Sequence, residues 1–347
     1  MAPQKVVISQ HLEQSLSQAL EECSFDRLFV LVDETTKCYC LPVLNSLHLT
    51  FDVITIGATD QHKTLDSLSH VWSELQRMGA TRHSLMINLG GGMVTDLGGF
   101  AASTFKRGIH YINIPTTLLS MVDASVGGKT GINFGGLKNE IGVFNNADCV
   151  ILDTEFLKTL DQENILSGYA EMLKHALISN EKMWAEHIQY SPLTSNLSPL
   201  SSMIADSVAV KQRIVTEDPT EKGLRKALNL GHTAGHAFES LALERTPILH
   251  GYAVAYGLVV ELYLSCVKTG FPTDKMHQTV HYIKEHYGQM AITCDDYPHL
   301  LELMHHDKKN EGTSINFTLL AGIGDLRINQ TATEEEIREA LDFYRDT

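Results

Sequence analysis

Cysteine is sparse and shows no pairing pattern in this sequence. The 347 residues contain six cysteines, and none forms the C-x-x-C spacing that is typical of zinc ribbons and redox motifs. Their low density also excludes a secreted scaffold held together by disulfides. The first residues lack the basic segment and apolar core of a secretory signal peptide. These absences predict a reducing, cytoplasmic environment.

Long apolar runs and an excess of basic residues are missing as well. No run of eighteen uninterrupted apolar residues occurs, so no membrane-spanning helix is expected. Lysine and arginine number 27 against 42 acidic residues, which gives a formal net charge of −15. This charge argues against nucleic acid or an anionic membrane surface as a partner. If the protein binds a small anion, its basic residues must gather in one cleft.

The first half of the chain alternates between strand-like and helix-like segments. Short apolar runs predict strands, at residues 5–8, 27–32, 51–56, 84–89 and 110–114. Longer periodic stretches predict helices, at residues 11–22 and 64–78. Such alternation is typical of βαβ units around a parallel sheet. We therefore predict an α/β fold with a Rossmann-like parallel sheet in this half.

The second half has a mostly helical pattern. Helical periodicity dominates six segments, at residues 162–187, 202–216, 233–243, 254–268, 273–287 and 333–344. Residues 191–202 are rich in Ser, Pro and Asn and predict a loop, and 314–320 alternates like a short strand. A chain of 347 residues exceeds the usual size of one domain. We predict two domains, 1–155 and 156–347, with the active site in the cleft between them.

A run of glycines follows the predicted strand 84–89 and opens a predicted helix. Gly90, Gly91 and Gly92 carry no side chain, so their backbone could approach a pyrophosphate at the helix start. The run departs from the strict G-x-G-x-x-G pattern, and a tight turn that binds nothing is the alternative. Asp33, which ends an earlier strand, could accept from a ribose hydroxyl or lie in a solvated turn.

Two histidines stand four residues apart in the segment 229–239, NLGHTAGHAFE. On a helix, His232 and His236 would lie on one face, one turn apart. Such a pair can hold one divalent metal, or one ring can bind metal while the other serves a substrate. Two ordinary helix histidines are the alternative. No glutamate follows His232, so the H-E-x-x-H motif of metalloproteases is absent.

Charged side chains recur beside glycines and around the histidine segment. They are Arg107, Lys129, Lys138, Glu171, Lys174, Lys211, Arg225, Lys308 and Lys309. Taken singly, each could be solvated, and Glu171 and Lys174 could form a surface pair. Residues 127–130 resemble the end of a P-loop, but the earlier glycine of that motif is missing, which argues against an NTPase. Together, these charged residues supply the cations and the carboxylate that a phosphorylated, carboxylated substrate and a metal would need.

Six long motifs occur in order along the chain. They read GGGMVTDLGGF, IPTTLLSMVDASVGGKTGIN, GYAEMLKHAL, LNLGHTAGHAFE, LHGYAVAYGL and DKK. Over residues 27–320 the sequence resembles the 3-dehydroquinate synthases, a family of sugar-phosphate cyclases related to metal-dependent polyol dehydrogenases. The resemblance implies an NAD-binding α/β domain, a helical metal- and substrate-binding domain, and a homodimer. It also implies the cofactors NAD⁺ and Zn²⁺, with Co²⁺ able to replace zinc.

The resemblance implies a role for each residue that matches the family pattern. The metal ligands would be Glu171, His232 and His250. The cofactor contacts would be Asp33, Asp60, Lys63, Gly91, Gly92, Met93, Asp96, Thr116, Thr117, Leu119, Asp123, Lys138, Asn139, Thr159 and Leu160. The substrate and catalytic contacts would be Arg107, Asp123, Lys129, Asn139, Lys174, Lys211, Arg225, Asn229, His236 and Lys308 or Lys309. Among these, His236 would relay a proton beside a metal ligand.

The implied reaction converts 3-deoxy-arabino-heptulosonate 7-phosphate to 3-dehydroquinate and phosphate, a step of the shikimate pathway. It would proceed by transient oxidation, phosphate elimination, re-reduction and intramolecular aldol closure. Two positions depart from the family pattern, since Ala124 stands where serine is frequent and Tyr252 where glutamate is frequent. The alternatives are another sugar-phosphate cyclase, a polyol dehydrogenase, or a binding protein that retains the fold. The cations Lys129, Lys211 and Arg225 argue against the dehydrogenase.

Overall fold

The computed structural model describes residues 4–193, 198–305 and 315–347. The chain forms two compact units, Met1–Asp161 and Gln162–Thr347, which we call unit 1 and unit 2. The boundary between the units lies after Asp161, a few residues beyond the predicted boundary after residue 155, and a helix begins at Gln162. Each is described by itself.

Unit 1 is built on a six-stranded sheet in the order β1-β8-β5-β4-β2-β3. Its strands are β1 (Val6–Ser9), β2 (Leu28–Asp33), β3 (Asp52–Ile56), β4 (Leu85–Gly90), β5 (His110–Pro115) and β8 (Cys149–Asp153). Every pair of neighbours is parallel. The central strands β2 and β4 are buried along their whole length, as expected when helices cover both faces. The predicted parallel sheet is confirmed.

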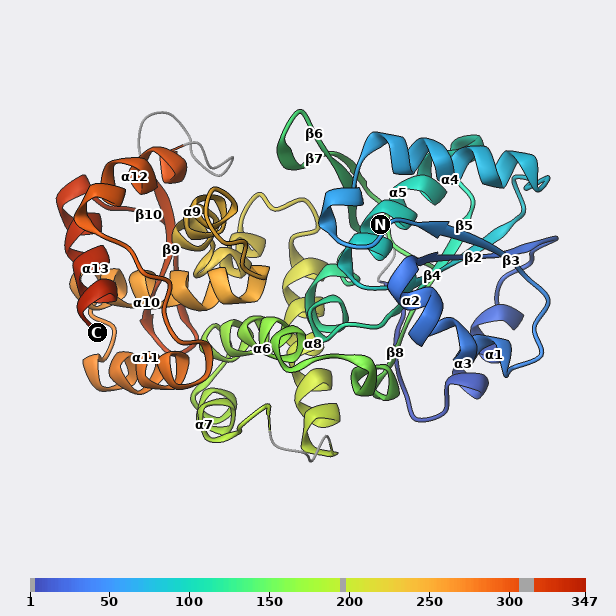
Figure 1. Cartoon of the computed structure of the whole chain (residues 1–347). Helices are drawn as coiled ribbons and strands as arrows, with labels where there is room; N and C mark the ends of the chain where they lie inside the picture. Colours follow the sequence, from blue (N-terminus) through green and yellow to red (C-terminus); the bar gives the residue numbers. More distant parts are fainter. Residues whose placement is uncertain (1–3, 194–197, 306–314) are drawn as a thin grey trace. The chain divides into compact units, whose positions relative to one another are not determined.

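Helices cover the two faces of this sheet (Figure 1). One face carries α4 (Leu65–Arg77) and α5 (Gly92–Thr104), and the other carries α1 (Leu12–Glu21), α2 (Glu34–Tyr39) and α3 (Leu41–Asn45). Glycine lets α5 approach closely, because a methyl group at Gly98 would collide with the Asn88 side chain of β4. That approach packs α5 against β4, the strand whose end leads into the glycine turn.

A two-stranded antiparallel hairpin, which the sequence did not predict, packs against α5. It consists of β6 (Lys129–Phe134) and β7 (Leu137–Phe144). Gly135 and Gly136 form its turn with φ values of 59° and 82°, a region that glycine adopts without strain. Lys129 and Lys138, which the sequence places beside glycines, lie on the two strands of this hairpin.

The described residues of unit 2 are mostly helical and include one antiparallel strand pair. Its elements are α6 (Gln162–Leu177), α7 (Glu181–Gln189), α8 (Ser198–Glu217), α9 (His232–Leu243), α10 (His250–Thr269), α11 (Thr273–Tyr287), α12 (Tyr297–His305), β9 (Asn316–Gly322), β10 (Asp325–Thr331) and α13 (Glu334–Asp346). The predicted single helix 162–187 is two helices, because Asn180 caps a new start by accepting from the Met183 backbone N–H. Helix α8 starts within the predicted loop 191–202.

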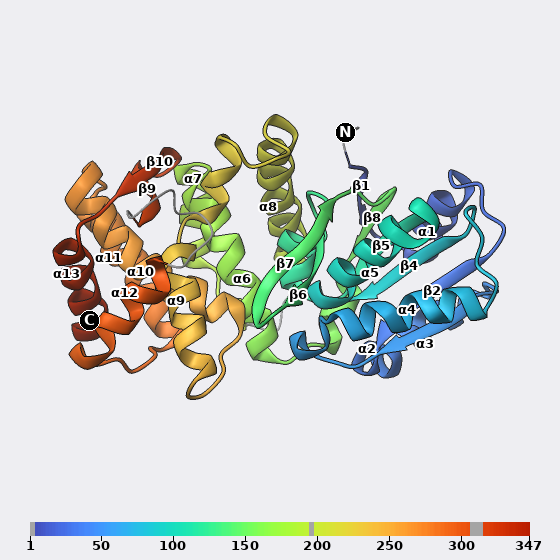
Figure 2. The same cartoon turned by 90° about the horizontal axis from the view of Figure 1, so that it is seen from above.

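The helix α10 is the core of unit 2. It contacts α6, α9, α11, α13 and β9, and it runs through the middle of the unit in Figure 1. By length and composition α10 could cross a membrane. However, 72% of its apolar stretch is buried inside the unit, as in the core helix of a globular domain. Figures 1 and 2 both show α9 beside α10. A methyl group at Gly257 would clash with the backbone of Gly231 and Gly235, so glycine permits this close packing.

Candidate functional site

Three side chains from three helices converge in unit 2. Glu171 lies on α6, while His232 and His250 are the first residues of α9 and α10. The Nε2 atoms of the two histidines lie 3.3 and 3.4 Å from the same Glu171 oxygen, Oε1. Their potential ligand atoms all lie within 4.8 Å of one another. The structure thus brings together the three residues that the resemblance implied as metal ligands.

The chemistry of this cluster fits a divalent metal. Two imidazole nitrogens and one carboxylate form a ligand set typical of catalytic zinc, which keeps a further position open. Glu171 is fully buried, and its Oε1 faces the two histidine Nε2 atoms while its Oε2 contacts the Lys174 ammonium. Burial would raise its pKa, but the Lys174 ammonium and His232 hold that pKa well below its usual value. The carboxylate is therefore anionic and able to bind a cation.

Lys174 accompanies Glu171 one turn along α6. The two side chains form an ion pair, and they are only 1% and 0% exposed. The alternative of a surface pair is therefore wrong. An ion pair in this position is retained at a considerable desolvation cost, so it is weak evidence for stability alone. It fixes the charge and orientation of the carboxylate.

His236 and Glu239 extend the cluster along α9. The ring centroid of His236 lies 5.4 Å from that of His232 and 5.9 Å from that of His250. The predicted placement of His232 and His236 on one helix face is confirmed. Glu239, which sequence reasoning missed, lies on the same face, with Oε2 3.4 Å from Nδ1 of His250. Its spacing of seven residues from His232 was the available signal.

A buried carboxylate caps the start of α9. Glu261 on α10 is fully buried and accepts from the backbone N–H groups of Gly231, Thr233 and Ala234, at 2.6, 2.9 and 3.2 Å. These N–H groups belong to the first turn, where a helix has no partners of its own. Glu261 therefore holds the turn that presents His232.

The Glu261→Ala variant should be less stable, because it leaves three buried N–H groups without their acceptor. We expect the free energy of unfolding to fall by about 1–3 kcal/mol. Chemical denaturation of the metal-free protein measures this change. Glu261→Gln, which retains one acceptor oxygen, should lose less. Equal stability of the wild type and Glu261→Ala would contradict the assigned role of the cap.

Two further cations predicted in this half, Lys211 and Arg225, are also buried. Lys211 on α8 is 5% exposed, and Arg225 is 2% exposed with its guanidinium donating to the Pro219 carbonyl at 2.7 Å. Asn229 donates to Glu221 at 2.9 Å, which adds a carboxylate that sequence reasoning missed. Buried cations of this kind suit an anionic ligand. Lys308 and Lys309 lie outside the described residues.

In unit 1 the glycine turn leads directly from β4 into α5. Gly91 precedes α5 and Gly92 begins it, followed by Met93. Space beside the turn is limited, because a methyl group at Gly91 would lie 3.1 Å from Thr117, and one at Gly92 would lie 3.2 Å from Ala124. The small side chain of Ala124 suits this packing. The helix start satisfies the backbone requirements of a pyrophosphate site.

Most of the other predicted cofactor residues of unit 1 fall into two groups. In the first, Lys63 pairs with Asp96 at 2.6 Å and contacts Asn139, while Asp60 lies 3.8 Å from Lys138. In the second group, Thr116 and Thr159 are hydrogen-bonded to the Cys40 thiol and Asp33 acts on it electrostatically, while Leu160 follows Thr159 in the chain. In that group, Asp33 also accepts from the Thr36 backbone N–H at 2.7 Å, so it is a buried helix cap rather than a solvated turn residue.

The other predicted residues of unit 1 occupy turns and a strand end. Leu119 and Asp123 lie at the π-helical turn Ser120–Ala124, a conformation that is frequent at functional sites. Lys129 begins β6 and is exposed. Arg107 is exposed in a left-handed conformation with φ of 70°.

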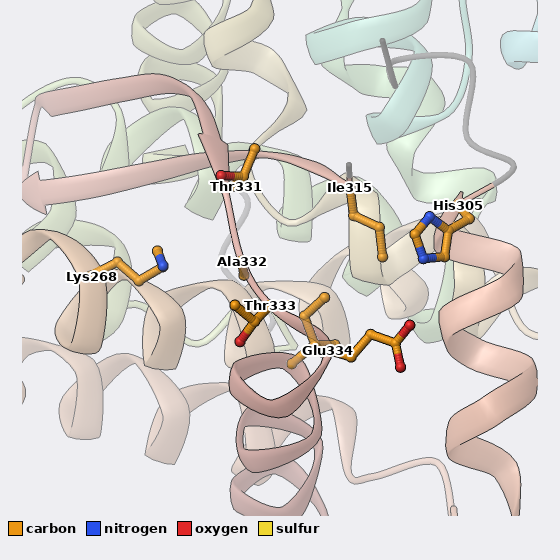
Figure 3. A pocket seen from close by; sticks show the side chains of 8 residues that line it. Lys268, His305, Ile315, Thr331, Ala332, Thr333 and Glu334 are labelled. Carbon is orange, nitrogen blue, oxygen red and sulfur yellow. The ribbon is translucent and has the colours of Figure 1, made fainter. Parts of the chain in front are cut away.

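A cavity of about 350 Å³ lies elsewhere in unit 2 (Figure 3). Its walls are formed by Lys268, His305, Ile315, Thr331, Ala332, Thr333, Glu334 and Ile337. Figure 3 shows Lys268 and His305 on opposite sides of it. Lys268 pairs with Glu336 at 2.7 Å. Of the predicted site residues within the described part of the chain, none lines this cavity, so we do not assign the site to it.

Comparison with known sequences matches both halves of the chain to one family. Residues 53–167 match the 3-dehydroquinate synthase N-terminal family, and residues 168–310 match the 3-dehydroquinate synthase C-terminal family. The chain is 55% identical over 350 aligned positions to the 3-dehydroquinate synthase of Parabacteroides distasonis, covering 100% of this chain and 99% of the relative. It is 39% identical to that of Pyrococcus furiosus, covering 94% and 96%.

Comparison with solved structures shows the same two-unit fold. The 2-epi-5-epi-valiolone synthase ValA of Streptomyces hygroscopicus, solved with NAD⁺ and Zn²⁺, aligns with a TM-score of 0.84 at 24% identity, covering 100% of this chain and 98% of that one. A 2-deoxy-scyllo-inosose synthase, solved with carbaglucose-6-phosphate, NAD⁺ and Co²⁺, gives 0.83 at 20% identity, covering 98% and 96%. A probable glycerol dehydrogenase of Sinorhizobium meliloti gives 0.68 at 15%, covering 99% and 97%.

Proposed function

Because the chain belongs to the 3-dehydroquinate synthase family, we propose that Glu171, His232 and His250 hold the metal of that reaction and that the glycine turn binds NAD⁺. The protein is a carbon–oxygen lyase that forms 3-dehydroquinate and phosphate from 3-deoxy-arabino-heptulosonate 7-phosphate. One observation carries the site assignment. A fully buried carboxylate faces the Nε2 atoms of two histidines that begin two packed helices.

The residues of unit 2 divide the chemical work. The zinc held there would supply polarisation of substrate hydroxyls, and bound NAD⁺ would supply reversible hydride acceptance. Lys174 keeps Glu171 anionic and oriented. His236, whose ring lies beside both histidine ligands, takes and returns a hydroxyl proton. Lys211 and Arg225 bind the phosphate and carboxylate of the substrate through charge-assisted hydrogen bonds.

The residues of unit 1 hold the cofactor. The N–H groups at the start of α5 would hold the pyrophosphate, because the glycines there carry no side chain to keep it away. The half-buried ion pair of Lys63 and Asp96 fixes Asn139, which Lys63 also contacts. Asp33, at the end of β2, caps α2 and would also accept from the ribose of the cofactor.

Phosphate release tests this function. The zinc-loaded protein with catalytic NAD⁺ should release phosphate from the heptulosonate phosphate without net accumulation of NADH. A chelator should abolish the release, and added zinc or cobalt should restore it. Turnover by metal-free protein would contradict the metal assignment. Preferred turnover of glucose 6-phosphate would favour another cyclase, and steady NADH formation from glycerol would favour a polyol dehydrogenase.

We further propose that two copies of the chain associate through the hairpin β6–β7. All eight residues of β7 are exposed, and five large apolar side chains lie on the hairpin. They are Phe134, Leu137, Ile141, Val143 and Phe144, with exposed fractions between 37% and 56%. A second copy would cover this apolar surface. Sedimentation should give a dimer that an Ile141→Lys substitution weakens, whereas a monomeric wild type would contradict the proposal.

We also propose a cytoplasmic location. Each of the six cysteines, all within the described part of the chain, is free. Free cysteines are the usual state in a reducing compartment. The net charge of −15 supports the proposal that nucleic acid is not a partner.

A further inference from the structure

We propose that Glu239 is a positioning residue of the metal site, acting through His250. Its carboxylate accepts the Nδ1–H of His250 and thereby directs Nε2, with its lone pair, toward Glu171 and His232. This inference rests on the proposed metal site and concerns a residue outside the ligand set. A carboxylate behind a ligating histidine fixes the tautomer and raises the basicity of the ring.

The geometry gives each nitrogen of His250 its own carboxylate. Nε2 lies 3.4 Å from Oε1 of Glu171, and Nδ1 lies 3.4 Å from Oε2 of Glu239. Glu239 is 7% exposed, so water competes little for its oxygens. A contact of 3.4 Å is long for a hydrogen bond. When one nitrogen of an imidazole donates its lone pair to a cation, the N–H on the other nitrogen becomes a stronger hydrogen-bond donor. The contact between His250 and Glu239 should therefore shorten when metal is bound.

Helix ends make this carboxylate necessary. His232 and His250 are each the first residue of a helix. The N-terminus of a helix carries a partial positive charge, which disfavours a cation. Glu261 offsets this charge at the start of α9, and Glu239 lies beside the ring that starts α10.

The buried charges around the ligands support the same role. Glu171, Glu239 and Glu261 are buried carboxylates, and Lys174 is a buried ammonium. Three negative charges and one positive charge leave a net charge of −2. That value matches a divalent cation. Removal of Glu239 would leave a net charge of −1 on the remaining three groups, which compensates only half the charge of a bound dication.

A different arrangement could use the same residues. His236, Glu239 and His250 also have ligand atoms within 4.8 Å of one another, so they could hold a second ion. The observed contact favours the positioning role, because Glu239 faces Nδ1 while Nε2 faces Glu171. An ion held through Nδ1 together with one at Nε2 would require a bridging imidazole that has lost both protons.

Zinc binding distinguishes these possibilities. Zinc stoichiometry and Kd would be measured by competition with a chromophoric chelator for wild type, Glu239→Ala and Glu239→Gln. We expect one zinc per chain, a Kd about 10- to 100-fold weaker in Glu239→Ala, and a smaller loss in Glu239→Gln, whose amide oxygen still accepts the N–H. Glu244→Gln is the matched control, because Glu244 ends α9 and contacts His299 at 2.9 Å on the surface. Its Kd should equal that of the wild type.

Each other outcome has a defined meaning. Denaturation of the metal-free variants verifies folding, and Glu239→Gln decides the question if Glu239→Ala does not fold. A wild-type Kd in the folded Glu239 variants overturns the inference while leaving the metal site intact. If the wild type binds two zinc ions and substitution of Glu239 removes only the second, Glu239 is a ligand. That result also overturns the inference. A wild type that binds no zinc overturns the proposed metal site itself.

Discussion

The Glu171→Ala variant should bind no zinc and should lose about 3–5 kcal/mol of unfolding free energy even without metal. The loss of zinc follows from removal of the one carboxylate that faces both histidine Nε2 atoms. The loss of stability has a separate cause. Lys174 is 1% exposed, so its ammonium would remain buried without its counter-charge.

A double variant separates these two effects. Glu171→Leu combined with Lys174→Met replaces the buried pair with apolar side chains of similar length, an exchange that is often neutral or stabilising. It should recover most of the stability but none of the zinc binding. Denaturation of metal-free protein measures the first quantity, and chelator competition measures the second.

A surface pair provides the control for this experiment. Glu155 and Lys158 have the same spacing of three residues and a contact of 2.6 Å, but their side chains are 71% and 61% exposed. Glu155→Ala should therefore change the unfolding free energy by less than about 1 kcal/mol.

Retention of zinc with wild-type Kd by Glu171→Ala would rule out Glu171 as a ligand.

The parallel sheet of unit 1 could be predicted from the sequence because its strands are buried apolar runs separated by amphipathic helices. The hairpin β6–β7 could not, since β7 is exposed on every residue and has no buried face to impose a period of two. The break between α6 and α7 was missed for the opposite reason. Helical periodicity continues on both sides of Asn180, and only its cap marks the new start.

The site was predictable to different degrees. The spacing of His232 and His236 on one helix face needed only helix geometry. The convergence of His250 and Glu171 with them depended on the family resemblance, because contacts between distant segments leave no local pattern. Glu239 and Glu261 were missed because an acidic residue in a helix is usually solvated. Their partners, a histidine ring and a helix start, come together only in the packing of α9 against α10.

The His236→Ala variant should keep its zinc but lose turnover. His236 lies one turn from His232 on α9, with its ring 5.4 Å away, and it is outside the group formed with Glu171. A residue in that position can exchange a proton with a bound substrate without holding the metal. Removal of a general acid–base group typically lowers the rate about 100- to 10,000-fold, so we expect kcat for phosphate release to fall by that factor.

Two measurements on the same preparation decide the role of His236. Chelator competition should give wild-type zinc stoichiometry and Kd, while the pH profile of the residual phosphate release should lose one ionisation present in the wild type. His299→Ala, which removes a surface histidine paired with Glu244, should change neither quantity. Loss of zinc in His236→Ala would instead make His236 a ligand. In that case the pair on α9 would bind the metal together, as helix spacing alone allows, and the proton relay would have to come from another residue.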